Sequence, residues 1–227
     1  MKKRSLVVAA LLAVVMVVGS GVASAAPIEL FFEVISENAA DPEISGAAAQ
    51  FKVVVSELVG GDIQFLITNN VGIPSSITLV QFGGTPAGLL PNNPTLVNSV
   101  GVNFSDGAQA FEAGPISNTF SALGYTALYS TNTTTPPHNG INASTESLGV
   151  VFSGPSFSDI ADALYGGDLR IAIKAQAIGA NEQLSAHYAT KVPERHEDPI
   201  PEPATMALLG LGIAGLAIRR GKSMLRG

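Results

Sequence analysis

The clearest structural signal in the sequence is Asp168-Leu169-Arg170-Ile171-Ala172-Ile173-Lys174. Its large apolar side chains at Leu169, Ile171 and Ile173 are separated by Arg170, Ala172 and Lys174, so that the two charges fall on the other face. Successive side chains of a β-strand point to opposite faces, so this period of two predicts a strand with one buried face and one solvated face.

The same strand pattern recurs along the chain. Apolar or β-branched runs occupy 28–35, 51–56, 62–68, 77–82 and 148–152. Pairs of Gly or Asn separate several of these runs, and such pairs are typical of turns. The stretches 84–94 and 130–140 are rich in Pro, Asn, Gly or Thr, and we expect both to be loops. His187, beside Tyr188, is expected on the last strand.

One short helix is predicted at 157–165. Ile160, Ala163 and Leu164 recur at helical spacing, Ser158 can cap the start and Gly166 can end the helix. Strands otherwise dominate, and the absence of a repeating strand-helix-strand rhythm argues against a parallel α/β sheet. The sequence therefore predicts a mainly β protein, an antiparallel β-sandwich with one short helix.

The N-terminus has the layout of a secretory signal peptide. A basic head, Met1-Lys2-Lys3-Arg4, precedes an apolar stretch at 6–18 and small residues that include Ala23 and Ala25. This order is typical of a signal that signal peptidase removes. We expect cleavage between Ala25 and Ala26, with an uncleaved membrane anchor as the alternative.

The C-terminus has three parts in a fixed order. Pro201, Glu202 and Pro203 precede an uncharged apolar segment at 204–218, and a basic cluster of Arg219, Arg220 and Lys222 follows. An apolar helix followed by basic residues keeps those residues in the cytoplasm, which places the body of the protein outside the inner membrane. A plain C-terminal membrane anchor is the alternative interpretation.

In these features the tail resembles the PEP-CTERM sorting signal of Gram-negative bacteria. The resemblance covers about the last 27 residues and rests on the tripeptide 201–203, the small-residue helix and the Arg219-Arg220 stop. It implies that an exosortase, an integral-membrane cysteine transpeptidase, removes the tail and passes the protein to the envelope. Proteins with this tail often accompany exopolysaccharide and biofilm genes.

These signals divide the chain into four parts. We expect a signal peptide at 1–25, a β-sandwich ectodomain at 26–190, a flexible stalk at 191–200 and the sorting signal with its transmembrane helix at 201–227. The chain contains no Cys, which excludes disulfides and thiol chemistry. Between Pro27 and Pro203 five Lys or Arg face eighteen Asp or Glu, a formal net charge of −13, which excludes a basic nucleic-acid footprint.

The ectodomain shows no pattern for catalysis, a metal or a cofactor. His138, His187 and His196 lack the spacing of a metal site. The glycines 210, 212 and 215 match a dinucleotide fingerprint only in spacing, because no strand-helix-strand unit surrounds them. Glu29 and Glu33 share a strand face, and Asp159, Asp162 and Asp168 lie close in sequence. We expect both acidic groups to be solvated, with a Ca²⁺ site left open at the second.

The sequence therefore predicts a non-enzymatic, exported surface or matrix protein that is plausibly associated with exopolysaccharide or biofilm. A polysaccharide-binding module, with or without Ca²⁺, is the second hypothesis, and an exposed platform of Tyr side chains would favour it. The sequence has no Trp and four Tyr, which argues against dedicated sugar stacking. A secreted hydrolase is the third hypothesis.

Overall fold

The computed structural model describes residues 25–195, and its period-two segments form ten antiparallel strands. These are β1 (Ile28–Val34), β2 (Phe51–Glu57), β3 (Ile63–Asn69), β4 (Ser76–Gly84), β5 (Thr95–Asn98), β6 (Phe104–Asp106), β7 (Thr126–Thr133), β8 (Ser147–Phe152), β9 (Leu169–Ile178) and β10 (Leu184–Thr190). The predicted mainly β, antiparallel class is confirmed. The predicted loop at 130–140 is wrong at its start, because residues 130–133 belong to β7.

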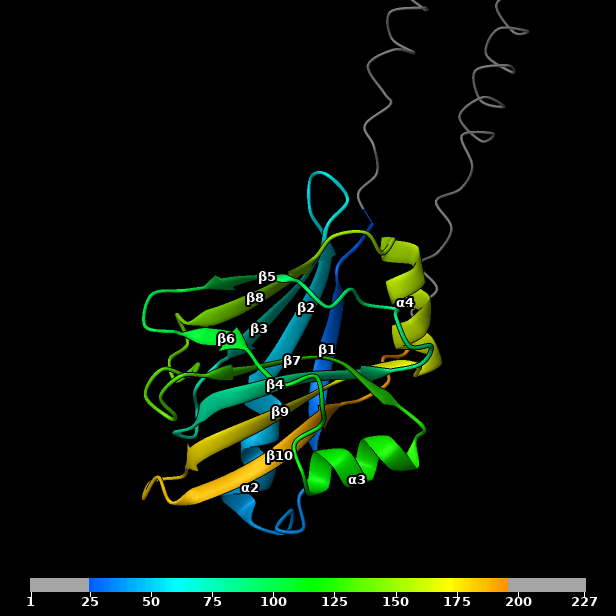
Figure 1. Cartoon of the computed structure of the whole chain (residues 1–227). Coiled ribbons are helices and arrows are strands. Elements are labelled where there is room, and N and C mark those ends of the chain that lie inside the picture. Colours follow the sequence, from blue (N-terminus) through cyan, green and yellow to red (C-terminus); the bar gives the residue numbers. More distant parts are fainter. Residues whose placement is uncertain (1–24, 196–227) are drawn as a thin grey trace, which may run out of the picture. The chain divides into compact units, whose positions relative to one another are not determined.

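The ten strands form one sheet rather than the two separate sheets of a sandwich. Their order is β5-β8-β3-β2-β1-β10-β9-β4-β7-β6. β1 joins the two halves, because residues 28–31 pair with β2 and residues 32–34 pair with β10. The predicted sandwich is corrected on this point. Figure 1 shows the sheet curling around β1 so that its two ends approach each other.

The free edges of the sheet meet at β5 and β6. The side-chain amide of Asn98 on β5 donates to the carbonyl of Phe104 on β6 at 3.1 Å and accepts from its N–H at 2.9 Å. One side chain thus satisfies both backbone groups that a neighbouring strand would satisfy in a continuous ladder. The sheet is therefore nearly closed.

The interior is filled by the inward face of each strand. Leu169, Ile171 and Ile173 are all buried there, as predicted. At the centre Phe65, Phe82 and Phe152 pack edge to face, with ring centroids 5.1–5.7 Å apart. Such packing adds to the free energy gained by burying the rings.

Three short helices accompany the sheet, where one was predicted. The predicted helix is α4 (Phe157–Gly166), but its N-cap is Ser156, which accepts from the N–H of Asp159. The additional helices are α2 (Pro42–Ala47) and α3 (Pro115–Ala122), and a 3-10 turn, η1 (Ala48–Gln50), follows α2. α2 and α4 each bury apolar side chains in the main core.

α3 covers the outer face of β9 and β10 instead (Figure 1). Ile116 and Phe120 of α3 pack on Ala172 of β9 and Ala189 of β10, and these four residues form a second apolar cluster. The small side chains at the two alanines let the helix approach the sheet closely. Phe111, in the segment before α3, joins the same cluster.

β1 begins and β10 ends at the same end of the fold. The two strands are antiparallel, with Phe32 opposite Thr190, and the N–H of Lys191 donates to the carbonyl of Phe31. The segment after β1 and the β9–β10 turn lie at the opposite end. Residues 191–195 have no regular secondary structure.

Three predicted segments lie wholly or partly outside the described residues. They are the signal at 1–25, the stalk at 191–200 and the apolar helix at 204–218. Within residues 25–195, no helix combines the length and the hydropathy that a transmembrane span needs.

Candidate functional site

The residues predicted to direct export and sorting lie almost entirely beyond the described part of the chain. Ala25 and Ala26 are exposed and precede β1 without regular structure. Ala23, Pro201, Glu202, Pro203, Arg219, Arg220 and Lys222 lie outside residues 25–195. Two residues, Ala26 and Pro27, therefore lie between the predicted cleavage point and β1, the strand that joins the two halves of the sheet.

Acidic side chains considered for catalysis or metal binding take part in ion pairs or in a helix cap. The half-exposed side chains of Glu29 and Glu33 pair with Lys52 at 3.1 Å and with Arg170 at 2.7 Å, respectively. Asp159 accepts a hydrogen bond from its own cap, Ser156. Within residues 25–195, no three His, Asp or Glu side chains converge in a way that would hold a metal ion.

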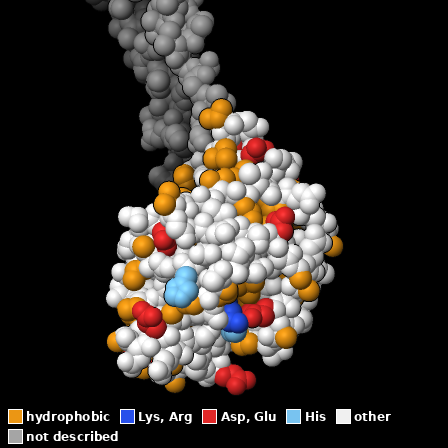
Figure 2. Space-filling view, turned by 60° about the vertical axis from the view of Figure 1, so that its left-hand side comes forward, with side chains coloured by type: hydrophobic (Ala, Val, Ile, Leu, Met, Phe, Trp, Pro, Cys, Tyr) orange, Lys and Arg blue, Asp and Glu red, His pale blue; other side chains and the backbone are white. Residues whose placement is uncertain are grey.

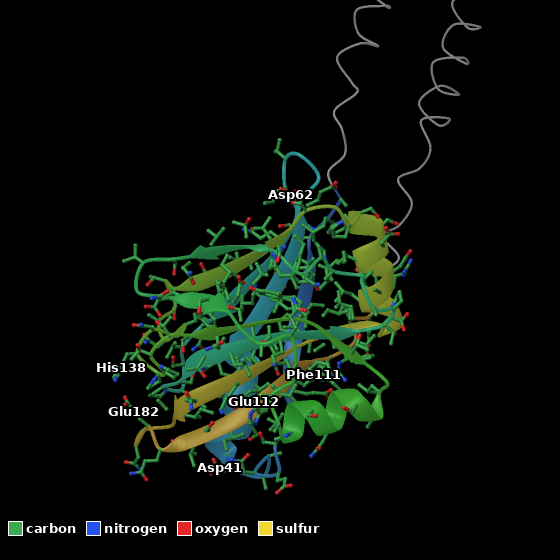
Figure 3. All side chains as sticks on the ribbon, viewed as in Figure 1. Asp41, Asp62, Phe111, Glu112, His138 and Glu182 are labelled. Atoms are coloured by element: carbon green, nitrogen blue, oxygen red, sulfur yellow. The ribbon has the colours of Figure 1, made fainter. Side chains whose placement is uncertain are left out.

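A polar cluster on the outer face of β9 and β10 is the candidate site. Lys174 and His187 are direct partners across these two strands. Glu112, from the segment before α3, binds both: its Oε1 lies 2.6 Å from Lys174 Nζ, and its Oε2 lies 2.9 Å from His187 Nε2. Figure 3 shows Glu112 near the start of α3, with Phe111 beside it.

A buried glutamine fixes the position of Glu112. Gln81 on β4 is 2% exposed. Its Oε1 accepts from the N–H of Glu112 at 3.0 Å, and its Nε2 donates to the carbonyl of Ala110 at 2.8 Å. These bonds tie the segment before α3 to the sheet, so Glu112 is held against its two partners rather than being free to turn into solvent.

The surroundings keep Glu112 ionised. Burial is the largest single influence and raises the pKa of its carboxyl, but the hydrogen bonds and charges of Lys174 and His187 together outweigh it. The pKa of Glu112 is therefore lowered below its ordinary value of 4.5. A carboxylate can only accept, so His187 Nε2 carries the proton in this contact, and in the neutral ring Nδ1 is an acceptor.

Ser36 lies on the other side of the imidazole. Its Oγ is 3.5 Å from His187 Nδ1, while it accepts from the backbone N–H of His187 at 2.6 Å. A serine, a histidine and a glutamate are thus aligned in the order that a nucleophile, a base and an acid would take. The contact with Nδ1 is long, and the short contact extends the pairing of β1 with β10.

Beside this cluster lies an open hollow of about 530 Å³. It is lined by Ile35, Ser36, Glu37, Asn38, Gly114, Pro115, Asn118, Thr119, Ser185 and His187. A second hollow of about 290 Å³, which includes His138 and Glu182, lies near the β9–β10 turn. Figure 2 shows a surface in which uncharged polar and backbone atoms predominate and hydrophobic atoms are scattered.

Sequence patterns singled out His187 but missed its partners. Glu112 is 75 residues away from His187 and Ser36 is 151 residues away. Neither belongs to a local motif, and both lie in irregular segments. The pairing of β1 with β10 brings Ser36 to His187, and Gln81 on β4 positions Glu112, so no signal in the neighbouring residues could have identified them.

The comparisons with known proteins give one match, which concerns the tail. Residues 199–221 match the family model of the PEP-CTERM protein-sorting motif. No curated protein and no solved structure matches the chain. The motif implies an exported, membrane-anchored precursor that is processed for the cell surface. The chain thus carries, at its C-terminus, the PEP-CTERM sorting motif that is recognised by an exosortase.

Proposed function

We propose that this chain is a non-catalytic cell-surface or extracellular-matrix protein of a Gram-negative bacterium, exported through signal peptidase and sorted by an exosortase. The observation that carries the proposal is the sorting motif at residues 199–221. Association with exopolysaccharide or biofilm is part of the proposal. The β domain acts by presenting its surface to the surroundings of the cell.

The course of the chain through the fold supports this role. β10 runs antiparallel to β1 and ends at Thr190, opposite Phe32. The segment 35–38 and Ser185, which line the larger hollow, lie at the opposite ends of these two strands. A protein held through its C-terminus would therefore keep this hollow away from the point at which its chain leaves the fold.

The geometry at Ser36 supports a non-catalytic role. Its hydroxyl oxygen is engaged by the N–H of His187 at 2.6 Å, whereas the contact with the imidazole is 3.5 Å long. A nucleophile needs a proton acceptor within ordinary hydrogen-bond reach. Treatment with a fluorophosphonate probe tests this directly: we expect no labelling, and covalent labelling of Ser36 would contradict the non-catalytic proposal.

Intact-mass measurement of protein recovered from the envelope and medium of its native host tests the sorting step. We expect a mature form that begins at Ala26 and ends near Pro203, with or without an attached group. A Glu202→Ala variant should retain the tail, whereas Glu194→Ala, outside the matched residues, should be processed normally. Recovery of a native form that still includes Arg219 and Arg220 would overturn the proposal.

A polysaccharide-binding role is the second candidate function. A platform of exposed Tyr side chains would favour it, but two of the four Tyr side chains, Tyr129 and Tyr188, are buried. The hydroxyl and amide groups around the larger hollow favour binding through hydrogen bonds instead.

A further inference from the structure

The larger hollow is built from three segments that are distant in sequence. The stretch after β1 contributes Ser36 and Asn38, the first turns of α3 contribute Asn118 and Thr119, and β10 contributes Ser185 and His187. α3 is anchored on the sheet through its buried side, so the walls belong to packed elements. The hollow's volume, about 530 Å³, lies in the range of pockets that take small molecules.

The chemistry of these six side chains selects a class of ligand. Serine, threonine, asparagine and neutral histidine each have both a donor and an acceptor. The lining, all of which lies in the described part of the chain, contains one carboxylate, Glu37, and no Lys or Arg. An anion would meet no charged donor there. A ligand with hydroxyl groups suits such a lining better, because a hydroxyl also donates and accepts.

Two of the lining side chains are available for such bonds. Asn118 is exposed and Thr119 is partly exposed. Their side chains make no hydrogen bond to any other residue of 25–195. A ligand could therefore engage them without breaking an internal contact, whereas Asn38 already donates to the carbonyl of Ser185.

His187, which lines the hollow, is held in place before any ligand arrives. Gln81 positions Glu112, and Glu112 fixes both the ring orientation and the proton of His187. A group that is already ordered loses little conformational entropy on binding.

We propose that the hollow between α3 and β10 binds an uncharged saccharide through the amide of Asn118 and the hydroxyl of Thr119, beside the fixed ring of His187. This deepens the binding role given above as second candidate and does not depend on the sorting step. A peptide is the weaker occupant, because its side chains need apolar subsites, and the lining offers only Ile35 and Pro115 as large apolar surfaces.

The test uses the full-length chain in detergent micelles and two probes of similar size. Neutral gluco-oligosaccharides and the anionic oligogalacturonates are titrated while the ¹⁵N signals of the Asn side-chain amides and the His187 ring are followed by NMR. We expect saturable shifts of Asn118 and His187 with the neutral probe, at a Kd near ~1 mM, and weaker shifts with the anionic probe.

Asn118→Ala should raise the Kd for the neutral probe about tenfold, which corresponds to the loss of one good hydrogen bond. Asn70→Ala, an exposed asparagine outside the hollow, is the matched control and should bind as the parent does. The proposal fails if no neutral probe shifts these signals at ~10 mM, ten times the expected Kd, if the anionic probe binds more tightly, or if both variants bind equally well. The mass of the sorted form is measured separately, so either proposal can fail alone.

Discussion

Lys174 and His187 stand directly opposite each other on β9 and β10, and the two oxygens of one carboxylate, Glu112, bind one of them each. Two groups that can both be positively charged would otherwise be neighbours on the same face of the sheet, where like charges are unfavourable. The carboxylate replaces the repulsion between them by two attractive contacts, and it ties the segment before α3 to both strands.

Replacing Glu112 by Gln should therefore destabilise the fold. The change removes the negative charge while keeping the shape, and it leaves Lys174 and His187 without a counter-charge. Hydrogen bonds to charged groups contribute about 1.5–3 kcal/mol, and partial exposure of these side chains reduces the expected loss to about 1–2 kcal/mol. Urea unfolding measures it. Glu57→Gln, at an exposed strand end, is the control, and equal midpoints for the two variants would contradict the prediction.

The same carboxylate predicts how stability depends on pH. The pKa of Glu112 is lowered in the folded state, so its contribution is fully present above the unfolded pKa, near 4.5, and is lost as the pH falls through the folded value. The difference in unfolding free energy between the parent and Glu112→Gln should thus shrink as the pH falls below about 4.5. A difference that grows below this pH would refute the assignment.

The seam of the sheet, where the edge strands β5 and β6 meet, is a second place at which a substitution should weaken the fold. Asn98→Ala removes the side-chain amide that bonds both backbone groups of Phe104, so the free energy of unfolding should fall by about 1–3 kcal/mol. Because β6 is three residues long, its amides should also exchange faster with solvent than those of β9. Asn93→Ala, on the exposed loop before β5, supplies the comparison. Unchanged exchange in β6 would show that the amide does not hold the seam.

The sequence predicted the strands whose two faces differ most. β2 and β3 alternate between buried and more exposed positions, and β9 does so in part, with Ala172 on its outer face buried under α3. The period of two is therefore visible in their residue types. β7 was not predicted as a strand, and one reason is that Ser130, Thr131 and Thr133 are polar yet buried. Ser130 and Thr131 are satisfied by contacts with Gln81 and with the carbonyl of Ser105, which no local pattern indicates.

The closure of the sheet and the candidate site could not be predicted from local sequence patterns. β1 changes its partner from β2 to β10 between Phe31 and Phe32. Its apolar and polar residues would alternate in the same way if it paired with one strand along its whole length. α2, with six residues, is too short for a periodic signal, although Asp41 caps it and Pro42 begins it. The tail differs, because its signal is contiguous, and there the prediction from sequence is confirmed.

The contact between α3 and the sheet gives the last prediction. Gly83 on β4 lies under the ring of Phe120, and a Cβ at this position would come within 2.3 Å of Phe120 Cδ2. Gly83→Ala should therefore push α3 outward and cost about 1–3 kcal/mol, as overpacking does. Phe120→Leu alone should also destabilise, because it removes a buried ring. In the double variant the smaller side chain makes room for the methyl group, so the two losses should sum to less than their separate values. Strict additivity in urea unfolding would mean that the sheet, rather than α3, yields to the added methyl group.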